Sequence, residues 1–195
     1  MRGVYSTTRA GLLIAASVVL TRFFGVMVPL AGVGALRLSF GDVPIIMASL
    51  FLGPVWGAAV GAASDLLGFA LNPMGGPYFP GFTLTAVLVG VLPALFLRLF
   101  TVGLERSGEG RAKLAFWRYL AAIACSDVIT SMVLNSYWIH IMYGKALAAI
   151  LPARIIARLV LIPISAALVS LTAQAMPVSL AALAKKPSTN GPTVG

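Results

Sequence analysis

Residues 43–71 read VPIIMASLFLGPVWGAAVGAASDLLGFAL, a run of 29 residues whose only charged side chain is Asp65. About 20 apolar residues are enough for a helix to cross the bilayer core, so this run is too long for one untilted helix. Gly53 and Pro54 interrupt it, and a proline removes a backbone hydrogen-bond donor. We therefore expect two short helices joined by a tight turn.

The composition of the whole chain is typical of a membrane protein. Hydrophobic residues make up 59% and charged residues 10% of the 195 residues, whereas soluble domains have roughly 45–50% and about 25%. After loops are subtracted, this length holds roughly five to seven spanning helices and leaves no room for a soluble domain. The net charge of +9 is spread around apolar runs, which indicates membrane topology rather than nucleic-acid binding.

We predict an all-α integral membrane protein with six transmembrane helices in a single domain, residues 1–184. A glycine-rich loop follows the first helix, a loop rich in Gly and Pro occupies residues 72–81, and we expect the polar tail, residues 185–195, to be disordered. The segments that hold the helices are Ala10–Leu30, Val43–Leu71 with two, Phe82–Phe100, Trp117–Tyr143 and Ala153–Met176.

The distribution of basic residues predicts the orientation. Lysines and arginines gather on the cytoplasmic side of membrane proteins. One side would carry Arg2, Arg9, Arg98, Arg106, Arg111, Lys113, Arg118, Lys185 and Lys186, and the other only Arg37, Lys145 and Arg154. Both termini are therefore expected in the cytoplasm of a multi-pass protein of the cell membrane.

The sequence lacks the residues that several kinds of functional site require. Cys125 and His140 are the only cysteine and histidine, which excludes an internal disulfide and a Cys/His zinc site. The chain has no GxxxxGK[ST] loop, so it cannot power transport by itself, and no GxSxG motif. We expect no cofactor, no metal ion and no catalytic residue.

Four ionisable residues fall within predicted helices, where a charge is costly and faces a partner or a polar cavity. They are Arg22, Asp65, Asp127 and Arg158. They either pair with one another or form a ligand site.

The fifth and sixth helices add further polar positions. At about 100° per residue, one arc of about 80° would hold Asp127, Ser131, Asn135 and Trp138. Arg154 and Arg158 lie one turn apart, a spacing suited to holding a carboxylate. Alternatively, Arg154 extends its charge to the membrane interface.

Two outer loops offer aromatic rings and polar groups on the same side. The first contains Arg37, Phe40 and Asp42, and the second contains Tyr78, Phe79, Phe82 and Thr83. Together with Arg154 and Arg158, these loop residues suit a flat, acidic solute. Aromatic side chains would stack on its rings, and arginines would bind its negative charge.

These segments resemble the S components of energy-coupling factor (ECF) transporters, and most closely the folate-type subgroup. The resemblance covers about Ala10 to Met176 and is carried by RLSFGDVP at 37–44, LGPVWG at 52–57, SDLLG at 64–68, GPYFPGFTL at 76–84, LNSYW at 134–138 and LPARI at 151–155. It implies a vitamin-binding membrane protein, here for folate, that works with a transmembrane T component and two cytoplasmic ATPase subunits. It also implies docking to the T component through Gly11 and Ala15, although this family usually has alanine at both positions.

The candidate site residues have three expected roles. Carboxylates would be bound by Arg22, Arg37, Arg154 and Arg158. Stacking would come from Tyr78, Phe79, Phe82 and Trp138, with Thr83 as a polar anchor, and hydrogen bonds from Asp65, Asp127 and Asn135. The alternatives are an S component for another vitamin, or a small membrane enzyme acting on lipid with Asp65 and Asp127 as acid and base.

Overall fold

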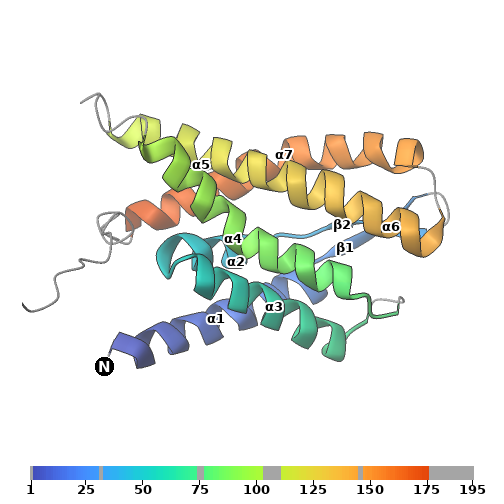
Figure 1. Cartoon of the computed structure of the whole chain (residues 1–195), viewed down its shortest axis with the longest axis horizontal. Helices are drawn as coiled ribbons and strands as arrows, with labels where there is room; N and C mark the ends of the chain where they lie inside the picture. Colours follow the sequence, from blue (N-terminus) through green and yellow to red (C-terminus); the bar gives the residue numbers. More distant parts are fainter. Residues whose placement is uncertain (1, 31–32, 74–76, 103–110, 145–146, 176–195) are drawn as a thin grey trace, which may run out of the picture.

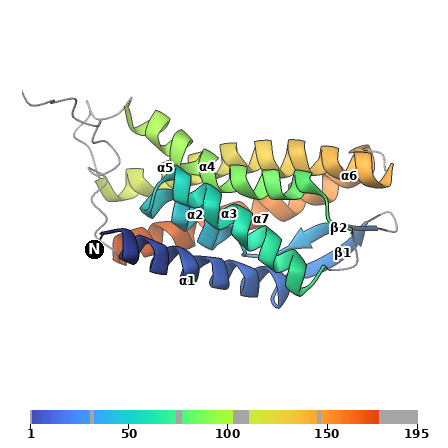
Figure 2. The same ribbon diagram turned by 60° about the horizontal axis from the view of Figure 1, so that its bottom comes forward.

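The computed structural model describes residues 2–30, 33–73, 77–102, 111–144 and 147–175, and its helices run along the long axis of the molecule (Figures 1 and 2). A π-helix, η1, joins α5 to α6 without a break. When these three are counted as one, the described part of the chain contains six helices, as predicted. The elements are α1 (Arg2–Arg22), α2 (Asp42–Phe51), α3 (Pro54–Leu71), α4 (Pro80–Val102), α5 (Arg111–Asp127), η1 (Val128–Leu134), α6 (Asn135–Tyr143) and α7 (Leu147–Ala175).

An antiparallel hairpin follows α1, where the sequence predicted that the first helix continues to Leu30. Helix α1 ends at Arg22, and strands β1 (Val26–Leu30) and β2 (Val33–Leu38) pair with each other. Alternating valines favour a strand, and Pro29 cannot continue a helix hydrogen-bond ladder. The hairpin lies at the same end of the molecule as α6 (Figure 1).

The short helix α2 occupies the centre of the bundle. Seven of its ten residues are buried. On one side, Val43, Ile46 and Leu50 belong to a core that includes residues of α4, α5 and α7. On another side, Ile45 and Ala48 pack with residues of α1 and α3. Helix α2 is therefore covered by protein on both sides.

The predicted break between two short helices is confirmed at Gly53. This residue has a φ of 105°, a conformation that favours glycine, and Pro54 opens α3. Helices α3 and α4 then approach at backbone distance. A Cβ added to Gly57 would lie 1.9 Å from the carbonyl oxygen of Gly90, and one on Gly61 would lie 2.2 Å from that of Ala86.

Four helical segments of the described chain are long and apolar enough to cross a membrane: Pro54–Leu71, Pro80–Phe100, Phe116–Tyr143 and Arg154–Ala173. Helix α2, with ten residues, is apolar but shorter. At 1.5 Å per residue it is about 15 Å long, roughly half of the hydrocarbon thickness.

Candidate substrate-binding site

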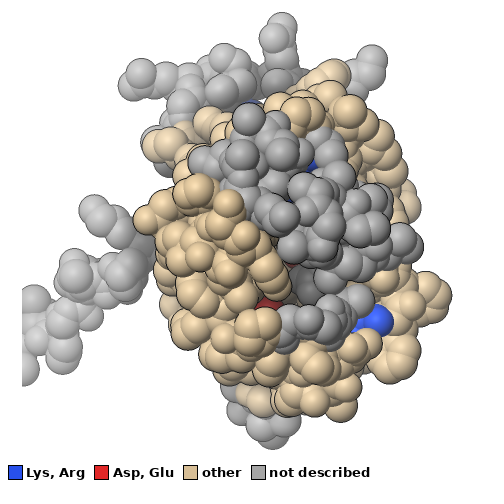
Figure 3. Space-filling model, turned by 90° about the vertical axis from the view of Figure 1, so that its right-hand side faces the viewer, with Lys and Arg blue, Asp and Glu red and all other residues tan. Residues whose placement is uncertain are grey.

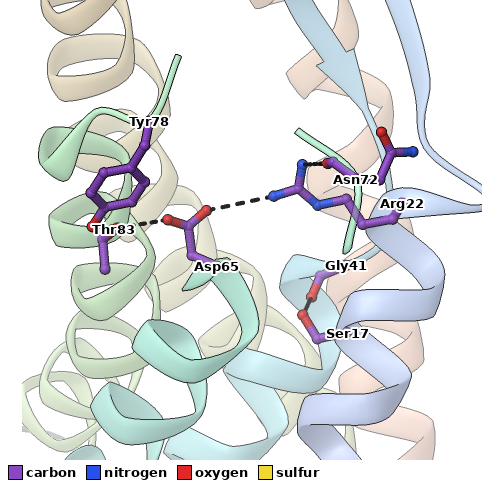
Figure 4. Close-up of polar contacts among 7 residues, drawn as sticks. All are labelled: Ser17, Arg22, Gly41, Asp65, Asn72, Tyr78 and Thr83. Atoms are coloured by element: carbon purple, nitrogen blue, oxygen red, sulfur yellow. Dashed lines mark hydrogen bonds and ion pairs between the residues drawn. The ribbon is translucent and has the colours of Figure 1, made fainter. Parts of the chain in front are cut away.

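Arg22 connects the end of α1 to the end of α3. Its side chain is buried, and Nη1 donates a 2.7 Å hydrogen bond to the backbone carbonyl of Asn72. Nη2 lies 4.0 Å from Oδ1 of Asp65 (Figure 4). Gly68 leaves room for the guanidinium group, since a Cβ there would lie 2.7 Å from its Nε. Asn72 was not predicted, because a backbone acceptor has no signature in the sequence.

Asp65 continues this contact to the start of α4 through two hydroxyl groups. Thr83 Oγ1 donates a 2.7 Å hydrogen bond to Oδ2 of Asp65. That bond uses the only hydroxyl proton of Thr83, so the Tyr78 hydroxyl, 2.9 Å away, donates to Thr83 Oγ1. The Tyr78 ring packs against Phe69, with 5.3 Å between centroids. Four predicted site residues, Arg22 among them, thus lie in one chain of contacts.

Three of the predicted aromatic residues form a cluster beside this chain. The Phe79 ring centroid lies 5.8 Å from that of Phe82 and 5.5 Å from that of Trp138. The Trp138 indole Nε1 donates a 3.1 Å hydrogen bond to Thr85 Oγ1, which itself donates to the carbonyl of Gly81. Thr85 was not predicted, because a threonine in an apolar helix commonly bonds only its own backbone.

Figure 3 views the end of the molecule where the hairpin and α6 lie. Among the described residues, uncharged side chains dominate this end. Atoms of Asp or Glu are visible only in a crevice between other residues. No three described His, Cys, Asp or Glu side chains come close enough together to hold a metal ion.

A second charged cluster joins α2, α5 and α7. Arg158 Nη1 lies 2.9 Å from Oδ1 of Asp127 and 3.6 Å from Oδ2 of Asp42. All three residues line a cavity of about 20 Å³, together with the hydroxyl residues Ser39, Ser126, Thr130 and Ser165. This volume suits about one water molecule. Of the two expectations for the four ionisable residues within the helices, the structure shows mutual pairing: Arg158 faces Asp127, and Arg22 faces Asp65.

Arg154 points into the bundle. Only 5% of the residue is exposed, and Nη1 donates a 2.8 Å hydrogen bond to the backbone carbonyl of Ser131 in η1. The interpretation that Arg154 extends its charge to the membrane interface is therefore wrong.

The single polar stripe expected along residues 127–138 is broken by η1. The backbone N–H of Asn135 bonds the carbonyl of Thr130, five residues back, instead of the residue four back. The extra residue turns α6 relative to α5, so that Ser136 is 2% exposed and Asn135 is only partly buried. The Asn135 Oδ1 atom is buried without a hydrogen-bond partner among the described residues.

The other predicted residues lie elsewhere. Arg37 pairs with Met27 in the register of the hairpin, and its side chain lies outside the described part of the structure. Gly11 and Ala15 are exposed on α1, and a Cβ on Gly11 would meet nothing within 4 Å. The tail, residues 185–195, also lies outside the described residues.

Comparison with known proteins decides the family. The family described as "ECF transporter, substrate-specific component" matches residues 6–173. The chain belongs to the ECF transporter S components. This S component is a membrane protein, and its relatives are transport proteins rather than enzymes, so the enzyme alternative is wrong.

Individual similar proteins agree with this family assignment. The chain is 30% identical to "Folate transporter FolT" of Clostridium novyi (strain NT) over 154 residues, 79% of each chain. It is 30% identical to FolT of Leuconostoc mesenteroides subsp. mesenteroides over 140 residues, 68% of each chain. The crystal structure of FolT bound with folic acid matches with a TM-score of 0.65 and 31% identity, covering 83% of this chain and 87% of that one. The S component of a bacterial ECF transporter shares the fold, with a TM-score of 0.54, 20% identity and coverage of 94% and 99%.

Proposed function

We propose that this S component binds folate, or a related vitamin, at the end of the bundle where α1, α3, α4 and α6 meet. The observation that carries the proposal is the adjacency of Phe82 and Thr83 at the start of α4. Phe82 belongs to the aromatic cluster, and Thr83 belongs to the hydrogen-bonded chain that leads to Asp65 and Arg22. The similarity to FolT bound with folic acid supports folate as the ligand.

The aromatic cluster suits the flat ring system of folate. Stacking or edge contacts between aromatic rings contribute about 0.5–1.5 kcal/mol each beyond the area they bury. Tyr78 is 42% exposed, and Phe79 and Trp138 are half-buried, so their rings offer surface that a ligand can cover.

Arg22 is the arginine best placed for a carboxylate of the ligand. Its 4.0 Å separation from Asp65 is long for an ion pair, so a carboxylate that approaches to hydrogen-bond distance would compete well. We propose Asp65 and Asn135 as hydrogen-bond partners for the ring edge. The remaining proposed ligand residues, Arg37, Asp127, Arg154 and Arg158, rest on the sequence pattern.

Fluorescence titration tests the proposal. Trp138 lies in the proposed site, and Trp117, 65% exposed on α5, lies outside it. Folate added to the purified protein in detergent should quench tryptophan emission saturably, while riboflavin, thiamine and biotin should not. Trp138→Phe should remove most of this response and Trp117→Phe should preserve it. A response to one of the other vitamins alone would change the ligand and leave the family unchanged.

We propose further that a T component and two cytoplasmic ATPase subunits drive delivery of the bound vitamin. The S component family supports this assignment, and the chain carries no phosphate-binding loop of its own. In this proposal the six helices make up one transmembrane domain, both termini are cytoplasmic, and Gly11 and Ala15 meet the T component.

A further inference from the structure

The π-helix η1 is the one place where the long helix formed by α5, η1 and α6 departs from α-helical pairing among the described residues. In an uninterrupted α-helix, residues five apart point about 140° away from each other. Ser131 and Ser136 are five apart, yet only 3% and 2% of them are exposed. The wide turn, marked by the bond from Asn135 to Thr130, brings both serines to buried positions.

Two side chains donate hydrogen bonds to carbonyl groups in or just before this wide turn. Thr130 Oγ1 donates to the Ser126 carbonyl at 2.9 Å, and Arg154 Nη1 donates to the Ser131 carbonyl at 2.8 Å. A shift from four-residue to five-residue pairing disturbs the partners of neighbouring backbone groups, and buried backbone groups need partners. Arg154 therefore provides a partner for a carbonyl group inside η1, and Thr130 provides one for a carbonyl group just before it.

Helix α6 depends on this turn for its orientation. If the same residues, with none removed, were wound as an α-helix throughout, everything beyond η1 would be turned by about one residue, or roughly 100°. Trp138 is four residues beyond η1 and contacts Phe79 and Thr85 of the neighbouring segment. A rotation of that size would move the indole away from both.

We propose that Arg154 is a positioning residue: together with Thr130 it holds the wide turn of η1, and thereby sets the rotation of α6 that places Trp138 against Phe79 and Thr85. The importance of this rotation for vitamin binding rests on the proposed function. The positioning itself does not, because it is a property of the ligand-free protein.

Emission from Trp138 in the absence of any vitamin tests the proposal. Trp56→Phe and Trp117→Phe leave Trp138 as the only tryptophan. In this background Arg154→Met should shift the emission maximum in the same direction as Thr85→Val, which removes the partner of the indole N–H. The matched control, Arg98→Met, removes an exposed arginine of α4 and should leave the emission unchanged.

A deletion separates positioning from a general loss of structure. Val133 lies in η1 and is 59% exposed. Removing it takes away the extra residue, so the link between α5 and α6 can become α-helical while Trp138 keeps its orientation. Deletion of Val133 in the Arg154→Met protein should therefore restore the parental emission maximum. If Arg154 only stabilised the fold in general, the deletion would move the emission maximum further from the parental value.

Two results would overturn the proposal: a folded Arg154→Met protein with unchanged Trp138 emission, or a deletion that does not restore it. If Arg154→Met does not fold by circular dichroism, Thr130→Val decides instead. It should shift the emission in the same direction, and unchanged emission would count against the proposal. Because no vitamin is added, failure of the folate assignment would appear separately, in the titration.

Discussion

Arg158 and Asp127 form an ion pair in which Nη1 lies 2.9 Å from Oδ1, with 15% and 12% of the two side chains exposed. The same guanidinium group faces Asp42 at 3.6 Å. Arg158→Met would leave both carboxylates without it, and breaking such a buried pair costs about 3–5 kcal/mol. We expect a large drop in the midpoint of thermal unfolding in detergent. Adding Asp127→Leu should recover part of it, and equal stability of parent and Arg158→Met would contradict the importance of the pair.

The contact between α3 and α4 should not tolerate a methyl group. A Cβ on Gly57 would lie 1.9 Å from the Gly90 carbonyl oxygen, which belongs to the backbone of α4. Gly57→Ala should therefore lower the free energy of unfolding by about 1–3 kcal/mol, as overpacking does. Gly11→Ala is the matched control, because its Cβ meets nothing within 4 Å. Equal unfolding midpoints for the two variants would show that the helices can move apart without cost.

The hydroxyl of Thr83 should contribute to vitamin affinity. It donates to Asp65 and accepts from Tyr78, so Thr83→Val removes both bonds. A hydrogen bond to a charged group contributes about 1.5–3 kcal/mol, so we expect folate to bind roughly tenfold more weakly or worse. Thr83→Ser keeps the hydroxyl and should bind as the parent does. If both variants bind folate with the parental affinity, the hydrogen-bonded residues Tyr78, Thr83 and Asp65 lie outside the binding site.

A bulky residue at Gly11 should prevent docking without affecting vitamin binding. Gly11 faces open space, so Gly11→Trp has room in the S component alone. We expect this variant to lose co-purification with the ATPase subunits and to titrate folate normally. Leu12→Trp is the control, because Leu12 is 72% exposed on the neighbouring face of α1. If only Leu12→Trp loses co-purification, the docking surface lies on the face of α1 that carries Leu12 and not on the face of Gly11.

Local rules were enough to predict the helices of the bundle and the break at Gly53. A long apolar run interrupted by Gly-Pro allows few structures, and Gly53 adopts a positive φ there. Pairing among Arg22, Asp65, Asp127 and Arg158 was one of two expectations from the sequence, and the structure shows it.

The hairpin and the π-turn depend on information that local periodicity does not carry. Residues 26–30 are as apolar as a spanning helix, and only the valines and Pro29 distinguish them from one. One extra residue in η1 leaves the hydrophobic periodicity before and after it intact. A constant rotation of about 100° per residue therefore misplaces Asn135 relative to Asp127. The acceptors of Arg22 and Arg154 are backbone carbonyls, which every sequence offers everywhere.

The central position of α2 has a consequence for biogenesis. A helix of ten residues is too short to be stably inserted into lipid by itself. Its buried side chains pack on α4, α5 and α7, all of which the ribosome makes later. During synthesis α2 therefore has only its contacts with α1 and α3 at first, and it is fully enclosed once α7 has emerged.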